Sequence, residues 1–272
     1  MKFVYKSILF FFCLALFLFL PKQKQPISLP IQENIYFAHR GLPFLAENSQ
    51  QGFLQSEALG FSALETDLNI TKDNELVLLH DNNLKRLLGI NKSIEEINWL
   101  EIEKLNIRHN DVITTNTVLK LEDLFIEDYS FKTIYLDIKS SSKIVADSLL
   151  SIIETHKAIE RFIIADANIF FLAYLKFKNP NIQTVLEGFN KGKEWTYYLI
   201  PESFMPNYWA SFYNQVDDKH ISFLKRKNLL EYKIVYGIDK SNIEEAQRMG
   251  LKHLILDYDA SIAPLIFSKN SD

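Results

Sequence analysis

Three short apolar runs, IYFAHRG at residues 35–41, ALETDL at 63–68 and LVLLHD at 76–81, each lead into ionisable side chains. Along the rest of the chain, similar runs rich in β-branched and aromatic residues alternate with longer helical patterns. That alternation predicts βαβ units and a parallel sheet. About eight such units in roughly 240 residues match the size of a (β/α)8 barrel. We therefore expect an α/β fold, a TIM-type barrel over residues 35–268, preceded by an N-terminal apolar helix.

The candidate strands are one more than an eight-stranded barrel requires. They are Ile35–His39, Ala63–Leu68, Leu76–Leu79, Thr133–Ile138, Phe162–Ala165, Gln183–Glu187, Tyr208–Phe212, Lys233–Gly237 and His253–Leu256. We expect Tyr208–Phe212 to be the surplus segment, because its pattern is the weakest. Residues 69–75 are too few for a parallel crossover, which takes about a dozen or more residues. The prediction is that they return in extended form without a helix, and that residues 82–132 pass over one end of the barrel without a strand.

The composition excludes several kinds of function. The chain has 272 residues and a formal net charge of −4, so no basic balance points to nucleic acid as a partner. Its only cysteine, Cys13, lies inside the N-terminal apolar run. The body of the chain therefore has no disulfide, no cysteine-based metal site and no thiol nucleophile.

The N-terminal segment has the pattern of a targeting signal. An uncharged, mostly apolar run from Ser7 to Leu20 lies between lysines on both sides. It matches a signal-peptide apolar region and is shorter than the roughly 20 residues that span a bilayer. Residues 1–20 are therefore expected to be a signal peptide or a signal-anchor helix, and residues 21–34 a linker. The protein would be anchored to a membrane by this segment, or exported to the periplasm or the exterior if it is cleaved.

Carboxylates gather where two of the predicted strands end. Glu65 and Asp67 are two residues apart on one strand, so they point to the same face, and Asp137 follows the run Ile134–Leu136. Active sites of such barrels form at the carboxyl ends of the strands. Three inward carboxylates near one rim would repel one another unless a cation lies among them. An all-oxygen set suits one divalent cation, Ca2+ or Mg2+, better than zinc.

The remaining polar groups at these strand ends are suited to phosphodiester chemistry. His39 and His80 follow two of the runs, and histidine can act as acid or base near neutral pH. Arg40 and Lys139 are cationic donors that can hold phosphoryl oxygens. Glu187 and Asp257 end later strands and are further candidates for the pocket wall.

These residues carry a resemblance to a known family. The elements are His39-Arg40-Gly41, Ala46-Glu47-Asn48-Ser49, Glu65-Thr66-Asp67, Thr71-Lys72-Asp73 and His80-Asp81, followed later by Asp137-Ile138-Lys139. In order and spacing they resemble the glycerophosphodiester phosphodiesterase family, over essentially residues 35–258. The chain departs from the family pattern at Asp137, where Glu is usual, and at Tyr236, where Trp is usual.

The resemblance implies a TIM-type barrel that cleaves glycerophosphodiesters to an alcohol and sn-glycerol 3-phosphate with a divalent metal. Carried over residue by residue, it implies metal ligands Glu65, Asp67 and Asp137, an acid/base pair His39 and His80, and phosphate contacts Arg40 and Lys139. Two rival hypotheses remain. One is a lysophospholipase D acting on lysophospholipids, and the other is a catalytically inactive barrel that serves as a binding module.

Overall fold

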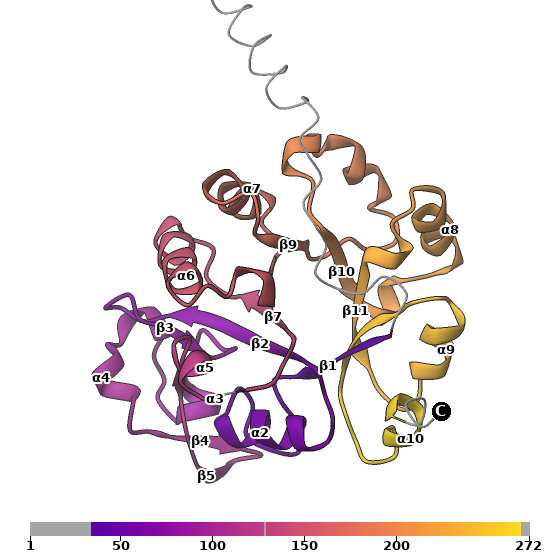
Figure 1. Cartoon of the computed structure of the whole chain (residues 1–272). Coiled ribbons are helices and arrows are strands. Elements are labelled where there is room, and N and C mark those ends of the chain that lie inside the picture. Colours follow the sequence, from indigo (N-terminus) through magenta and orange to yellow (C-terminus); the bar gives the residue numbers. More distant parts are fainter. Residues whose placement is uncertain (1–33, 128, 268–272) are drawn as a thin grey trace, which may run out of the picture.

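Eight parallel strands form a closed barrel in the computed structural model, which describes residues 34–127 and 129–267 (Figure 1). Neighbouring strands pair in the order β1-β12-β11-β10-β9-β8-β7-β2, and β2 closes the ring on β1. The eight strands are β1 (Ile35–His39), β2 (Ala63–Ile70), β7 (Thr133–Ile138), β8 (Phe162–Asp166), β9 (Gln183–Leu186), β10 (Tyr208–Phe212), β11 (Lys233–Ile238) and β12 (His253–Leu256). The predicted TIM-type barrel is confirmed.

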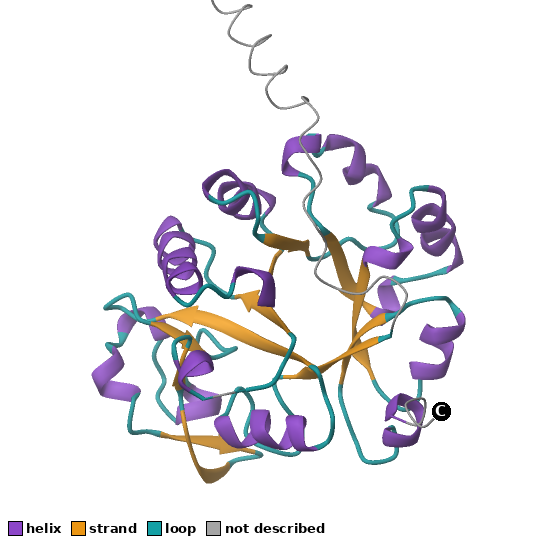
Figure 2. Ribbon diagram, viewed as in Figure 1, coloured by secondary structure: helices purple, strands orange, loops and turns teal. Residues whose placement is uncertain are grey.

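The helices lie outside the ring of strands (Figure 2). They are α2 (Gln50–Ala58), α3 (Lys85–Leu88), α4 (Trp99–Ile102), α5 (Asp123–Ile126), α6 (Lys143–Thr155), α7 (Ile169–Lys178), α8 (Asp218–Arg226), α9 (Ile243–Arg248) and α10 (Ala263–Phe267). Side chains fix where several of them begin. Ser49 accepts a hydrogen bond from the backbone of Gly52 at the start of α2, and Ser142 accepts one from Val145 at the start of α6.

The barrel interior explains why polar residues at the strand ends face one another. Alternate strand residues point inward and form a buried apolar cluster. Its members are Phe37, Ala63, Tyr135, Ile163, Ala165, Val185, Tyr208, Ala210, Ile234 and Ile255. Because the side-chain period of a strand is two, the next inward positions toward the carboxyl ends include His39, Glu65, Asp137, Glu187 and Asp257. The apolar layer is thus the floor of the site.

The expected extended return between the second and third strands is wrong. β3 (Leu76–Leu78) pairs antiparallel with β2, with Leu68 opposite Leu78 and Ile70 opposite Leu76. The connection is a hairpin, closed by the hydrogen bond from the backbone N–H of Thr71 to the carbonyl of Glu75. His80 nevertheless reaches the site. β2 continues beyond Glu65 and Asp67 to Ile70, and the returning strand brings the residues after Leu78 back toward Asp67.

Two further expectations about strands are corrected. Tyr208–Phe212 is β10, a full member of the barrel that pairs with β9 and β11, and the surplus strand is β3. Residues 82–132 contain strands, contrary to the prediction: β4 (Asn106–His109), β5 (Val112–Thr117) and β6 (Leu119–Lys120). The β4–β5 hairpin forms its own small sheet, and β6 extends the barrel sheet by pairing with β3. Tertiary pairing, rather than local apolar alternation, defines these short strands.

The predicted signal segment and linker lie outside the described residues, apart from Asn34 at the linker's end. Among the helices that the structure does describe, none is long and apolar enough to cross a membrane.

Candidate active site

Six of the seven predicted site residues line one pocket at the carboxyl ends of the barrel strands. The pocket has a volume of about 310 Å3 and is lined by His39, Arg40, Glu65, His80, Tyr135, Asp137, Lys139, Glu187, Phe212, Tyr236, Gly237, Ile255 and Asp257. The seventh, Asp67, is fully buried beside it. Its carboxylate pairs with Lys139 Nζ at 3.0 Å and with Arg40 Nε at 3.1 Å. The structure thus brings all seven together.

The three predicted metal ligands form a compact group. Glu65, Asp67 and Asp137 each offer a carboxylate oxygen, and these atoms lie within 4.8 Å of one another. Burial and the nearby Asp67 raise the pKa of Glu65 to about 7. Burial and the nearby Glu187 raise the pKa of Asp137 to about 8. Both shifts show how costly this concentration of negative charge is. An oxygen-only set with such a need for positive charge fits a hard divalent cation.

Two cationic side chains already lie against these carboxylates. Lys139 Nζ donates to Asp137 and forms an ion pair with Asp67. Although burial lowers the pKa of Lys139, the two carboxylates raise it overall. Burial alone would raise the pKa of Asp67, but Lys139 and Arg40 bring it below its ordinary value. The site therefore keeps one ionised carboxylate between two cations. The same two cations are close enough to hold the oxygens of a phosphoryl group.

The turn after β1 is shaped by backbone conformation. Arg40 has φ of 49° and Gly41 φ of 87°, so both residues are in the left-handed region. A Cβ on Gly41 would lie 2.9 Å from the backbone of Gly52 in α2, which only glycine avoids. The turn directs the Arg40 N–H to Glu65 Oε2 at 2.9 Å. Backbone and side chain of Arg40 thus both face the carboxylates.

Asn48 supports the carboxylates from the next loop. Its side-chain NH2 donates to Asp67 Oδ2 at 2.8 Å, and its amide oxygen accepts from Thr66 Oγ1 at 2.8 Å. Both contacts are buried. Asn48 therefore fixes the orientation of a candidate metal ligand, a role that the sequence pattern did not assign to it.

The two histidines are held in the same way. His39 Nδ1 lies 2.5 Å from Asp257 Oδ1, and His80 Nδ1 lies 2.8 Å from Asp81 Oδ1. An ionised carboxylate only accepts hydrogen bonds, so each Nδ1 carries a proton. Each Nε2 is then available to exchange a proton with another group. The Nε2 of His39 lies 3.8 Å from Glu65 Oε2. Burial lowers the pKa of His39, but Glu65 and Asp257 outweigh it and raise the pKa overall.

Three further residues complete the pocket wall: Glu187, a candidate from the sequence, Tyr236, a departure from the family pattern, and Phe212, to which the sequence assigned no role. Glu187 accepts a hydrogen bond from the buried Tyr135 hydroxyl at 2.6 Å. Phe212 and Tyr236 meet edge to face, with ring centroids 5.6 Å apart. Inward alternation along β10, in which Tyr208 and Ala210 face the barrel interior, was the signal that could have found Phe212. Asp257, considered only as wall, proves to be the partner of His39.

Comparison with known proteins is consistent with this geometry. The model of the glycerophosphoryl diester phosphodiesterase family matches residues 39–259, which include every residue of the site described above. The chain belongs to this family. The family resemblance seen in the sequence is thus confirmed.

The relatives that resemble this chain carry the names of two activities, glycerophosphodiester phosphodiesterase and lysophospholipase D. "Probable glycerophosphodiester phosphodiesterase 2" of Mycobacterium tuberculosis is 31% identical over 48% of this chain and 47% of its own length. The chain thus matches about half the length of this relative. Lysophospholipase D GDPD3 of Homo sapiens is 25% identical over 83% of this chain and 82% of its own. A phosphodiesterase of Oleispira antarctica, solved with the product sn-glycerol-3-phosphate, superposes with a TM-score of 0.74 at 17% identity, covering 84% of this chain and 94% of the other.

Proposed function

We propose that this protein hydrolyses glycerophosphodiesters to an alcohol and sn-glycerol 3-phosphate in a metal-dependent reaction, with His39 and His80 as the acid/base pair. One observation carries the proposal. Two histidines with Nδ1 held by aspartates lie in one pocket with two cations and with Glu65 and Asp137, and the buried Asp67 completes the group of three carboxylates beside it. This is the set of groups that cleavage of a phosphodiester needs.

The charged groups bind and orient the substrate in this proposal. Arg40 and Lys139 hold the phosphoryl oxygens, and they give up part of their contact with Asp67 to do so. Glu65, Asp67 and Asp137 would hold one divalent cation, Ca2+ or Mg2+, which supplies further positive charge to the substrate oxygens when bound. The buried setting strengthens each of these interactions relative to water.

The histidines move protons through their Nε2 atoms. One histidine accepts a proton from the attacking water as the water oxygen forms the new P–O bond. The other donates a proton to the oxygen of the departing alcohol as its P–O bond breaks. Asp257 and Asp81 stabilise whichever ring becomes positively charged, because each already accepts from Nδ1.

The test is release of sn-glycerol 3-phosphate from glycerophosphocholine, measured with and without EDTA. Wild-type protein should release it, EDTA should stop the release, and added Ca2+ or Mg2+ should restore it. His39→Ala and His80→Ala should each lower the rate severely. Equal release in every sample would overturn the proposal.

A lysophospholipase D activity is the second candidate. A neighbouring cavity of about 410 Å3 shares His39, Arg40 and Asp257 with the catalytic pocket. Leu42, Pro43 and Leu45 contribute an apolar side to this cavity. Together with the relative from Homo sapiens, this apolar side favours room for an acyl chain. Faster release of choline from lysophosphatidylcholine than from glycerophosphocholine would favour this activity. The binding-module hypothesis is disfavoured, because both histidines and all three carboxylates are present.

For location, we propose that residues 1–20 anchor the protein to a membrane, or direct its export and are then removed. The support is the apolar run between lysines. Membrane fractionation of full-length protein against protein lacking residues 1–20 tests the anchor.

A further inference from the structure

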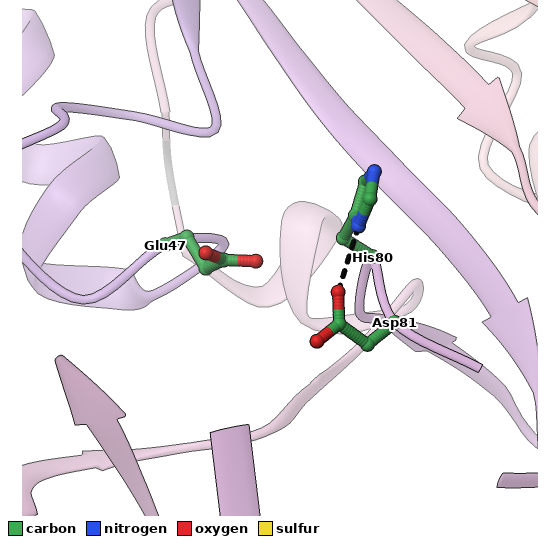
Figure 3. Close-up of side chains that lie close together, drawn as sticks. All are labelled: Glu47, His80 and Asp81. Atoms are coloured by element: carbon green, nitrogen blue, oxygen red, sulfur yellow. Dashed lines mark hydrogen bonds and ion pairs between the residues drawn. The ribbon is translucent and has the colours of Figure 1, made fainter. Parts of the chain in front are cut away.

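A second group of acidic and imidazole side chains lies beside the catalytic pocket. Glu47 comes from the loop between β1 and α2, and His80 and Asp81 follow β3 (Figure 3). One ligand atom from each lies within 4.8 Å of the others, as in a candidate cation site. The group differs from the three-carboxylate site in that it contains an imidazole and in that one arginine bonds to both of its carboxylates.

Arg86, from α3, already supplies the positive charge that this group requires. Its Nη1 and Nη2 donate to Glu47 at 2.7 and 2.8 Å. Its Nε and Nη2 donate to Asp81 at 2.6 and 2.7 Å. The guanidinium thus makes a two-bond contact with each carboxylate, a geometry that lysine cannot reproduce. We assign no metal to this group.

These contacts determine how His80 is presented. Oδ1 of Asp81 accepts both from His80 Nδ1 and from Arg86 Nη2. Arg86 therefore fixes the plane of the carboxylate that in turn fixes the imidazole ring and its tautomer. Without Arg86, the Asp81 side chain is free to rotate, and His80 loses its orienting partner.

The same guanidinium also reaches the phosphate side of the pocket. Glu47 Oε1 accepts from Arg86 Nη2 at 2.8 Å and from Arg40 Nη1 at 3.4 Å. A continuous series of hydrogen bonds therefore runs from His80 through Asp81, Arg86 and Glu47 to Arg40. It joins a candidate proton-transfer group to a candidate phosphate-binding group.

We propose that Arg86 is a positioning residue that sets His80 and Arg40 for the reaction by holding Asp81 and Glu47 together. The proposal rests on the function proposed above for the pocket. Arg86 itself remains outside the reacting groups, since its donors are directed at the two carboxylates.

Chemical rescue tests this role. The Arg86 side chain is 51% exposed and lines the 410 Å3 cavity, so Arg86→Ala leaves a space that guanidinium ion can enter. We expect Arg86→Ala to lower kcat for glycerophosphocholine by roughly 10- to 100-fold. Millimolar guanidinium should restore much of the loss, whereas equal NaCl or methylammonium should not. Arg86→Lys should keep only part of the activity. Lys85→Ala, the neighbouring exposed position, is the matched control and should match wild type.

A second readout is independent of activity. In nitrogen-15 spectra of the histidine rings, wild-type His80 should show the proton on Nδ1, with the signal assigned by its loss in His80→Ala. Arg86→Ala should shift the ring toward mixed tautomers, and guanidinium should reverse the shift. An unchanged His80 spectrum together with wild-type kcat in Arg86→Ala would overturn the positioning role. If the spectra change as expected but wild type cleaves no glycerophosphodiester, the proposed function fails and the positioning role stands.

Discussion

Asp257 provides a sharp test of how the histidines are prepared for proton transfer. Its Oδ1 lies 2.5 Å from His39 Nδ1. A hydrogen bond to a charged group contributes about 1.5–3 kcal/mol, and about 1.4 kcal/mol corresponds to a factor of ten. Asp257→Ala removes this bond at the point in the reaction where His39 is charged. The substitution should therefore lower kcat by roughly 10- to 100-fold.

Asp257→Asn should be more damaging than Asp257→Ala. The amide NH2 can donate to Nδ1, which would then accept and leave the proton on Nε2. That tautomer cannot act as a base at Nε2. Asp257 also raises the pKa of His39, so either substitution should move the limb of the rate profile that reports His39 to lower pH.

The assay is the pH dependence of kcat for wild type, Asp257→Ala and Asp257→Asn. Asp259→Asn is the matched control, because Asp259 is exposed and bonds to Ser261 instead. Wild-type kcat and an unmoved pH profile in Asp257→Asn would refute the proposed arrangement of His39.

Three further predictions follow from the structure. Metal affinity should weaken below about pH 8, and binding should release protons, because burial and nearby carboxylates raise the pKa of Asp137 to about 8 and of Glu65 to about 7. Calorimetry in several buffers measures both effects. A pH-independent affinity without proton release would contradict this prediction. Gly41→Ala should lower the free energy of unfolding by about 1–3 kcal/mol more than Gly192→Ala does, since both glycines have positive φ but only Gly41 also lies against the backbone of α2. Equal urea midpoints for the two variants would contradict the expected clash with α2. Burial lowers the pKa of Lys233 to about 7, so above that pH the unfolded state binds one more proton than the folded state. The free energy of unfolding should therefore rise with pH, by up to about 1.4 kcal/mol per pH unit. Lys233→Met should lack this rise, and the same pH dependence of unfolding free energy in both proteins would contradict the prediction.

The convergence of the candidate site residues could be predicted because barrel strands impose a simple order. Side chains alternate along each strand, and the carboxyl ends meet at one rim, so Glu65, Asp67 and Asp137 had to converge once the strands were placed. The pairing of His39 with Asp257 could not be read in this way. These residues are 218 positions apart, and only ring closure between β1 and β12 brings them together.

The path of the chain to His80 was predicted wrongly for a physical reason. The segment between β2 and β3 is visibly too short for a parallel crossover. Its sequence does not show how far β2 extends past the rim. The structure resolves this with a hairpin in which Leu68 lies opposite Leu78. The short strands β4, β5 and β6 were missed because their stability depends on pairing partners and not on an apolar pattern.

The central claim is that His39 and His80 act together on a phosphodiester held in one metal-dependent pocket. The most direct measurement is the rate of sn-glycerol 3-phosphate release from glycerophosphocholine by wild type, His39→Ala, His80→Ala and the double variant, each with and without EDTA. Groups that act as a unit lose nearly everything with the first substitution. We expect an EDTA-sensitive wild-type rate, severe loss in each single variant, and little further loss in the double variant. Single variants that retain the wild-type rate, or a wild-type rate that EDTA leaves unchanged, would contradict the claim.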